Sequence, residues 1–306
     1  MTGAAVPSPK HRKLPIVFIL ASVVPTLILT VLFIVIPTLR ALWLSFTDAT
    51  SLGLNSRFVA FENYAYMLRD RYFILALVNT AKLMAVVPAV TIALGVGLAY
   101  MISQSKLKER GLYRAILYFP NIVSLTVVGI IWSFVFHPNL GIINTTLRAI
   151  GLEGLARPWL GDSRTALWCI AVTLVWQATG YYMVMHIAAM DGISPEIYEA
   201  AKIDGAGAWR RLTSITAPLI KDIIGITFVL ALSGTLNLSF TLSKVMTGGG
   251  PNGASSVLLQ YMYQQGFMRG NFGYAMSITV FTLTLSVLLS GLSRRMTSEK
   301  KEGVGR

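Results

Sequence analysis

Charge is scarce in this chain. Asp, Glu, Lys and Arg together make up 13% of its residues, whereas hydrophobic residues make up 54%. Soluble domains carry about 25% charged residues, because a surface that faces water needs charge to stay in solution. The composition therefore excludes an ordinary soluble domain and favours a chain that faces lipid.

Thiols and metal-binding groups are also scarce. The single cysteine, Cys169, excludes an intrachain disulfide and a thiol-rich metal site, and we expect it to be a small buried hydrophobic residue. The three histidines, His11, His137 and His186, match no metal-ligand spacing. No set of acid, base and nucleophile near one face is visible. We therefore predict no metal, no cofactor and no enzymatic activity in this chain.

Acidic residues are missing from the apolar runs, because every Asp and Glu falls in a loop, a tail or a helix end. A proton-coupled carrier is expected to bury at least one carboxylate in the membrane. Lys82 is the only charge well inside an apolar run, and its long stem lets the ammonium reach the interface. The pattern favours a passage powered by another subunit over a secondary carrier or a membrane-embedded enzyme.

Six apolar runs are long enough to cross the ~30 Å hydrocarbon core of a bilayer as helices. None shows the strict alternation of a barrel strand. The first run is too long for the core of a signal peptide. We predict an all-α polytopic membrane protein with six transmembrane helices, at residues 14–36, 73–102, 112–136, 165–187, 223–242 and 272–292, between short tails at 1–13 and 293–306.

The basic residues predict the orientation. Lys and Arg concentrate in the two tails and in the loops that follow the second and fourth runs. Loops rich in Lys and Arg stay on the cytoplasmic side. We therefore expect a bacterial inner-membrane protein with both termini in the cytoplasm. The net charge of +13 is then mostly a topology signal, and little of it is left to indicate nucleic-acid binding.

Neutral polar side chains occur within the fourth and fifth runs. Aromatic rings stack on sugar faces and amides or hydroxyls bond sugar hydroxyls, so such groups suit a neutral polyhydroxyl solute. Hydrogen bonding between helices explains the same residues equally well. The candidates to line a sugar path are Gln177, Tyr181, Tyr182, Asn237 and Ser239.

The loop at 194–218 carries the strongest local pattern. Ser194 can cap a helix, Pro195 suits its first position, and the Asp204–Gly205 pair predicts a turn with a left-handed glycine. A second short helix follows, with Trp209 and Leu212 on one face. Two short helices around a glycine turn could form a docking knob or an amphipathic hairpin that lies on lipid, and shape alone does not choose between them.

A family resemblance favours the docking knob. Glu199-Ala200-Ala201 followed by Asp204-Gly205-Ala206 resembles the EAA loop of the permease subunits of ATP-binding-cassette (ABC) importers. Leu212 and Ala217 depart from that pattern, in which an aromatic residue and a leucine are frequent. The resemblance implies that these six residues belong to coupling helices that sit in a cleft of the ATPase subunit.

Further motifs are similar to carbohydrate permeases of the first-subunit type. They are Tyr113-Arg114, Phe119-Pro120, Trp132, Gly141 with Asn144, Thr247-Gly248-Gly249-Gly250-Pro251, and Gly273-Tyr274-Ala275. The glycine run 248–250 lacks the GK[ST] ending of a phosphate-binding loop, so we interpret it as a turn or as a contact for a binding protein. Thr241 stands where the family often has Asp.

This resemblance implies a transporter made of several subunits. The chain would have the type I ABC-importer (MetI-like) fold and would pair with a second permease subunit as a heterodimer. Two ATP-binding-cassette ATPase subunits and an extracytoplasmic solute-binding protein would complete the importer. Its cargo would be a sugar or oligosaccharide, and ATP would be hydrolysed outside this chain.

Overall fold

The computed structural model describes residues 16–50, 56–104 and 108–298. Within these ranges the regular structure is helical, apart from an isolated antiparallel bridge between Thr47 and Phe58. The elements, in which η1, η3 and η4 are π-helical and η2 is a 3₁₀ turn, are α1 (Ile16–Thr30), η1 (Val31–Val35), α2 (Ile36–Leu44), α3 (Glu62–Met67), α4 (Arg71–Gln104), α5 (Arg110–Ile122), α6 (Leu125–Val135), α7 (Ile142–Ala149), η2 (Glu153–Leu155), α8 (Ala166–Asp191), α9 (Pro195–Ile203), α10 (Ala208–Arg211), η3 (Leu212–Thr216), α11 (Ala217–Leu219), α12 (Lys221–Met246), α13 (Leu258–Tyr263), η4 (Gln264–Met268) and α14 (Phe272–Ser298).

Four helical stretches in the described part of the chain are long and apolar enough to cross a membrane: Val23–Leu44, α4, α8 and α12. The α5–α6 pair provides a fifth if it counts as one span, although it is bent by 97°. The apolar portion found in α14, Phe272–Leu288, is shorter. The all-α membrane fold is therefore as predicted, while the count of six spans stays a prediction.

Several boundaries differ from the predicted ones. The first apolar helix continues to Leu44, α12 continues to Met246, and α14 continues to Ser298, which lies in the predicted tail at 293–306. Helices extend past their apolar runs because the backbone hydrogen bonds continue into polar surroundings. The predicted tail at 1–13, the start of the first span at 14–15 and residues 299–306 lie outside the described residues.

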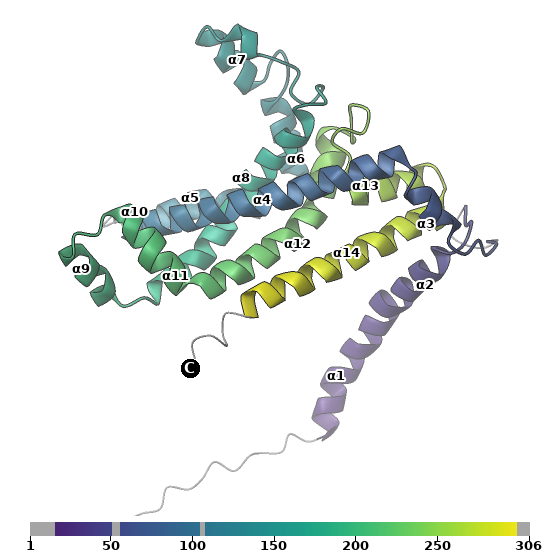
Figure 1. Cartoon of the computed structure of the whole chain (residues 1–306), viewed down its shortest axis with the longest axis horizontal. Helices are drawn as coiled ribbons and strands as arrows, with labels where there is room; N and C mark the ends of the chain where they lie inside the picture. The colour runs from purple at the N-terminus through teal and green to yellow at the C-terminus, as the bar shows by residue number, and fades with distance from the viewer. Residues whose placement is uncertain (1–15, 51–55, 105–107, 299–306) are drawn as a thin grey trace, which may run out of the picture.

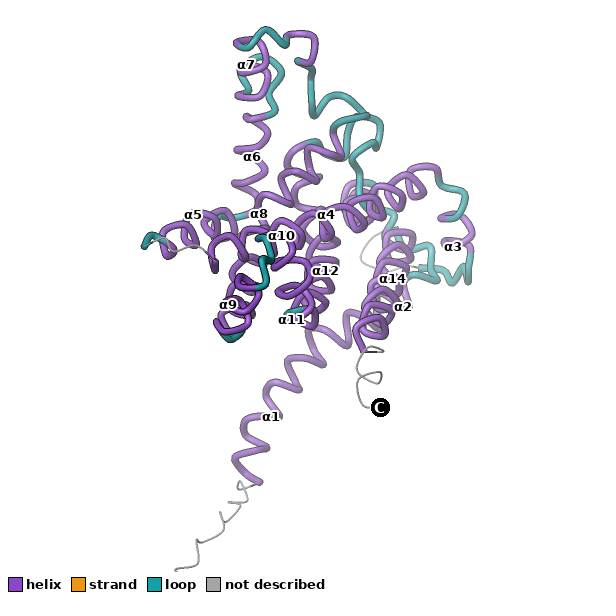
Figure 2. Tube along the Cα trace, turned by 60° about the vertical axis from the view of Figure 1, so that its left-hand side comes forward, coloured by secondary structure: helices purple, strands orange, loops and turns teal. Residues whose placement is uncertain are grey.

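α4 is the central helix of the bundle. It packs along α8 and also along α12, and α14 runs beside them (Figure 1). One buried cluster joins α4, α8 and α12 through Leu83, Ile170 and Leu242. A second joins α4, α8 and α9 through Ala99, Met183 and Tyr198. α2 packs on α14, and α1 leads away from the bundle in one direction, while α6 and α7 leave it in another (Figure 2).

The predicted third span, 112–136, is two helices rather than one. Pro120 lies in the last turn of α5, and the chain is extended at Val123 and Ser124 before α6 begins. Proline removes a backbone donor and weakens the turn that contains it. The two halves then pack on different partners, because α5 lies mainly on α8 and α6 mainly on α12. A continuous apolar run therefore folds with a sharp bend.

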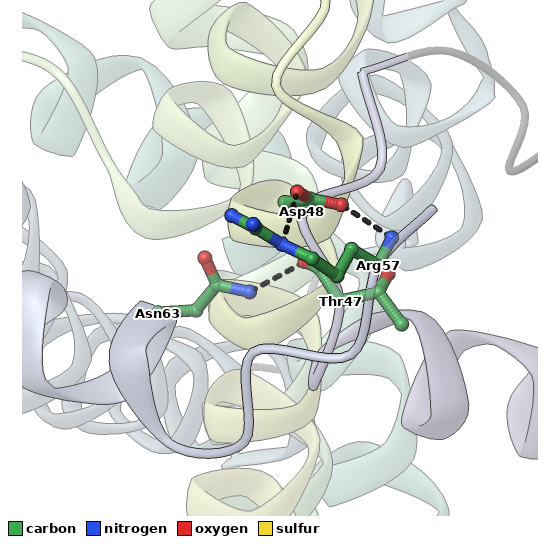
Figure 3. Close-up of polar contacts among 4 residues, drawn as sticks. All are labelled: Thr47, Asp48, Arg57 and Asn63. Atoms are coloured by element: carbon green, nitrogen blue, oxygen red, sulfur yellow. Dashed lines mark hydrogen bonds and ion pairs between the residues drawn. The ribbon is translucent and has the colours of Figure 1, made fainter. Parts of the chain in front are cut away.

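Residues 47–50, which follow α2, lie against the start of α14, where the backbone N–H of Gly273 donates to the carbonyl of Ala49 at 2.9 Å. Figure 3 shows the contacts that Thr47 and Asp48 make with Arg57 and Asn63. Arg57 pairs with Asp48 at 3.6 Å, and the backbone N–H of Arg57 donates to the Asp48 carboxylate at 2.6 Å. The Asn63 amide donates to the carbonyl of Thr47 at 2.8 Å. A Cβ on Gly273 would overlap that same carbonyl oxygen. The glycine of the Gly-Tyr-Ala motif thus lets α14 begin directly against this segment.

Candidate functional site

The 194–218 loop forms a helical hairpin at one end of the bundle (Figure 1). Pro195 occupies the first turn of α9, as predicted, although the Ser194 side chain makes no capping hydrogen bond. Gly205 has φ of +75°, a left-handed conformation that strains any residue with a Cβ. The following segment is the short helix α10 followed by the π-helical η3. The sequence therefore predicted the turn accurately and the second helix only in outline.

One face of this hairpin is anchored to the bundle. Tyr198 and Ala201 are buried, and Tyr198 belongs to a buried cluster with Ala99 of α4 and Met183 of α8. Arg211 of α10 donates to the carbonyl of Ala206 in the turn at 2.9 Å and to the hydroxyl of Tyr100 of α4 at 3.4 Å. These contacts make the hairpin a fixed projection rather than a loose loop.

The other face of the hairpin is exposed. It carries Glu199, Ala200 and Asp204, together with two large apolar side chains, Ile203 at 87% exposure and Trp209 at 75% exposure. Large apolar side chains that are this exposed are typical of contact surfaces. Four of the six residues of the EAA resemblance, counting Gly205, lie exposed here, while Ala201 is buried and Ala206 is half-buried.

The hairpin is connected directly to the long helices. α8 ends at Asp191, just before it, and Arg114 of α5 pairs with Asp191 at 3.4 Å. Deeper in the bundle, the buried His186 of α8 lies with Nε2 2.9 Å from the hydroxyl of Thr227 on α12. Displacement of the hairpin would therefore be passed to α5, α8 and α12 together.

The five predicted sugar-path residues fall into two groups. Tyr181 and Asn237 are exposed, whereas Gln177, Tyr182 and Ser239 are buried. The Ser239 hydroxyl bonds the Leu236 carbonyl of its own helix at 3.1 Å. Tyr182 lines a small cavity of about 20 Å³ between α4, α8 and α12. The side-chain carbonyl oxygen of Gln177 is buried and accepts no hydrogen bond from the residues that the structure describes. These residues do not form one pocket in this structure.

An apolar groove of about 690 Å³ lies where α5 and α6 diverge. Val90 and Leu94 of α4, Phe119 of α5 and Trp168 and Trp176 of α8 are among its walls. Almost no polar group faces it, and a sugar needs hydrogen-bond partners for its hydroxyls. The groove is therefore a poor candidate for the sugar path.

The glycine run after α12 is a folded turn. Gly248 and Gly249 have positive φ, and the backbone N–H of Gly249 bonds the Thr247 hydroxyl at 3.1 Å. The Ser255 hydroxyl donates to the carbonyl of Gly250 at 2.6 Å. Phosphate-binding loops leave their N–H groups free for the phosphate. The backbone N–H groups of Gly249 and Gly250 are hydrogen-bonded within the turn. This supports the interpretation of the glycine run as a turn rather than a phosphate-binding loop.

Sequence reasoning missed a buried carboxylate. Asp70, just before α4, is 8% exposed and accepts hydrogen bonds from the hydroxyls of Tyr261 at 2.5 Å and Tyr274 at 2.6 Å. Burial, and then the Asp70 carboxylate, raise the pKa of Tyr261, so its hydroxyl keeps the proton that it donates. Asp70 lies outside the predicted span at 73–102, and no local signal indicated this cluster.

Sequence reasoning also did not single out Lys244 as a functional residue. Its ammonium lies 4.0 Å from the centroid of the Tyr263 ring, in the last turn of α12. An aromatic residue that meets Lys244 from another helix cannot be found by spacing within α12. This cluster is considered further below.

Comparisons with known proteins agree with this architecture. The diacetylchitobiose uptake system permease protein NgcF of Streptomyces coelicolor is 34% identical over 93% of this chain and 84% of its own length. The lactose transport system permease protein LacF of Rhizobium radiobacter is 33% identical over 91% of this chain and 93% of its own length.

The fold is shared with a solved transporter. A bacterial alginate ABC transporter, solved in complex with an alginate pentasaccharide-bound periplasmic protein, has a chain that superposes with a TM-score of 0.81. The two chains are 22% identical, and the match covers 92% of this chain and 94% of the other. The family model for the binding-protein-dependent transport system inner membrane component matches residues 91–299. The chain belongs to this family of ABC-transporter permeases.

Proposed function

We propose that this chain is one of two permease subunits of an ABC importer that carries a sugar or oligosaccharide across the bacterial cytoplasmic membrane. Relatives whose names assign them diacetylchitobiose or lactose support the class of cargo. The second permease, two ATPase subunits and an extracytoplasmic binding protein are the partners in this proposal. Both termini face the cytoplasm in it, as the distribution of Lys and Arg indicates.

The exposed face of the α9–α10 hairpin is the observation that carries the proposal. A hairpin made to lie on lipid presents apolar residues flanked by Lys and Arg. This face also carries the exposed Lys202 and Arg210, but it places the carboxylates of Glu199 and Asp204 among them beside Ile203. Such a mixture of charges suits a protein cleft with basic groups at its rim. We assign the contact with the ATPase to Glu199, Ala200, Ala201, Asp204, Gly205 and Ala206.

Transport would follow from movement of this hairpin. Closure of the ATPases on ATP pushes the hairpin, and its links through Asp191 and Tyr198 tilt α8, α5 and α12. The solute path then opens alternately to each side of the membrane. Gln177, Tyr181, Tyr182, Asn237 and Ser239 stay candidates to line this path, with the exposed Tyr181 and Asn237 first among them.

Two substitutions test the coupling contact. Glu199→Arg reverses a charge in the contact, and Gly205→Pro removes the left-handed turn. Each should reduce ATP-dependent sugar uptake by at least about tenfold, the equivalent of one lost charged contact. Glu153→Arg, the same change in the exposed η2 segment at the far end of the bundle, is the matched control and should leave uptake unchanged. If uptake persists with Glu199→Arg in a fully assembled transporter, the assignment is wrong.

A further inference from the structure

An aromatic cluster with one lysine lies where α12, the continuous α13–η4 segment and α14 meet. The Lys244 ammonium is 4.0 Å from the centroid of the Tyr263 ring and 5.8 Å from that of Phe240. Tyr263 stacks on Phe267 with centroids 5.2 Å apart, and Phe267 meets Phe272 at 5.7 Å. We call these five residues the Lys244 cluster. Three separate segments contribute to it, so the fold rather than local sequence assembles it.

The positive charge of this cluster is not compensated by a carboxylate. Among the residues that the structure describes, the ion pairs are Arg57 with Asp48 and Arg114 with Asp191. Lys244 is itself exposed, and Phe267 is 62% exposed. A ring face attracts an exposed ammonium by only about 0.5–1 kcal/mol, which leaves its attraction for an anion almost intact. The cluster thus offers an open ring and an available cation side by side.

The cluster continues the polar face of α12. Asn237, Thr241 and Lys244 are spaced four and three residues apart, so they follow one another along one side of the helix. The seven helical steps from Asn237 to Lys244 rise about 10.5 Å. Gln264 of η4 donates to the carbonyl of Gly248 at 3.2 Å and holds the glycine turn at the edge of the cluster. An exposed amide, a hydroxyl, a cation and ring faces therefore form one strip.

We propose that the Lys244 cluster is the outer subsite of the solute path and that it accepts a sugar carrying a carboxylate or phosphate group. The ring of Phe267 stacks on the apolar face of the sugar, while the Lys244 ammonium pairs with the acid. A neutral sugar would cover the ammonium without compensating its charge, which is costly. The inference rests on the proposed function and narrows its cargo from sugars in general to acidic ones.

Binding of small matched sugars to the complete transporter in lipid nanodiscs tests this inference. The probes are methyl β-glucuronide and glucose 6-phosphate, which are anionic, and methyl β-glucoside, which is neutral. Saturation-transfer NMR measures their affinities without any need to know the natural cargo. At least one anionic probe should bind at least about tenfold more tightly than the glucoside, the effect of one charged hydrogen bond.

Four variants distinguish the effect of the Lys244 charge on binding from an effect on folding. Lys244→Met should abolish the preference for the anionic probe, Lys244→Arg should keep it, and Phe267→Ala should weaken all three probes. Lys221→Met, at the other end of the same helix, is the matched control and should change nothing. The inference is overturned if neither anionic probe binds, if the glucoside binds equally well, or if Lys244→Met leaves the preference intact.

The coupling proposal can be judged separately. Lys244→Met lies far along α12 from the hairpin, so ATP hydrolysis stimulated by the binding protein should survive in this variant. Glu199→Arg should lose that stimulation and still bind the anionic probe. Failure of the acidic-sugar inference would therefore leave the importer assignment standing, and failure of the importer assignment would appear in the Glu199 variant alone.

Discussion

Gly180 lies where α5 crosses α8. A Cβ at this position would overlap the carbonyl oxygen of Leu117 and would crowd the backbone of Tyr118. Backbone cannot swing aside as the end of a flexible side chain can, so any larger residue has to push α5 away from α8. The close crossing explains why a glycine stands in the middle of an apolar membrane helix.

Gly180→Ala should destabilise the chain by about 1–3 kcal/mol, the range for overpacking a well-packed contact. Gly97→Ala in α4 is the matched control, because a Cβ there meets nothing within 4 Å. The control should be neutral or slightly stabilising, since alanine favours helix over glycine. Thermal unfolding of both purified variants in one detergent checks the difference. Equal unfolding temperatures would show that the crossing tolerates a Cβ.

Some residues could be assigned from sequence because their chemistry is local. The left-handed turn at Gly205 follows from the Asp-Gly pair, and the first turn of α9 follows from Pro195. Asn237 and Ser239 looked equivalent, yet one is exposed and the other buried. The two residues are two positions apart and therefore face nearly opposite sides of α12. Which of these sides is covered is set by packing rather than by pattern.

At the scale of elements, Asp70 ties three helices together. It lies directly before α4 and bonds Tyr261 of α13 and Tyr274 of α14. Its backbone carbonyl also accepts from the N–H of Ile74 in the first turn of α4. The carboxylate thus fixes the start of α4 against α13 and the start of α14.

Asp70→Ala should lower the free energy of unfolding by about 2–4 kcal/mol, because two buried hydroxyls lose their acceptor. Replacing both tyrosines with phenylalanine removes those donors, so Asp70→Ala should then cost clearly less. A double-mutant cycle of chemical unfolding measures this coupling. If the free-energy costs of Asp70→Ala and of the tyrosine replacements simply add, the hydrogen bonds between these residues contribute no stability.

The long helices were predictable and their bends and contacts were not. Apolar runs determine α4, α8 and α12, since length and composition suffice for a membrane helix. The bend between α5 and α6 escaped prediction because 112–136 is one unbroken apolar run, and Pro120 alone indicates only a kink. The partners of Asp70 escaped because they lie 191 and 204 residues away along the chain.

At the scale of the whole molecule, the proposed topology places the hairpin and the α7 region on opposite sides of the membrane. Leu140 beside α7 is 83% exposed, and Ser214 beside the hairpin is exposed. A membrane-impermeant thiol reagent on intact cells should label Leu140→Cys and should label Ser214→Cys only after permeabilisation. The native Cys169 is buried and adds little background. The reverse labelling pattern would invert the orientation.

The most direct measurement is sugar accumulation in proteoliposomes that contain both permeases, with the binding protein and its bound sugar on one side and ATP on the other. Our account predicts accumulation against a gradient only when the ATPase subunits are present and Glu199 is intact. Accumulation by the permeases alone, with no ATPase attached, would contradict it.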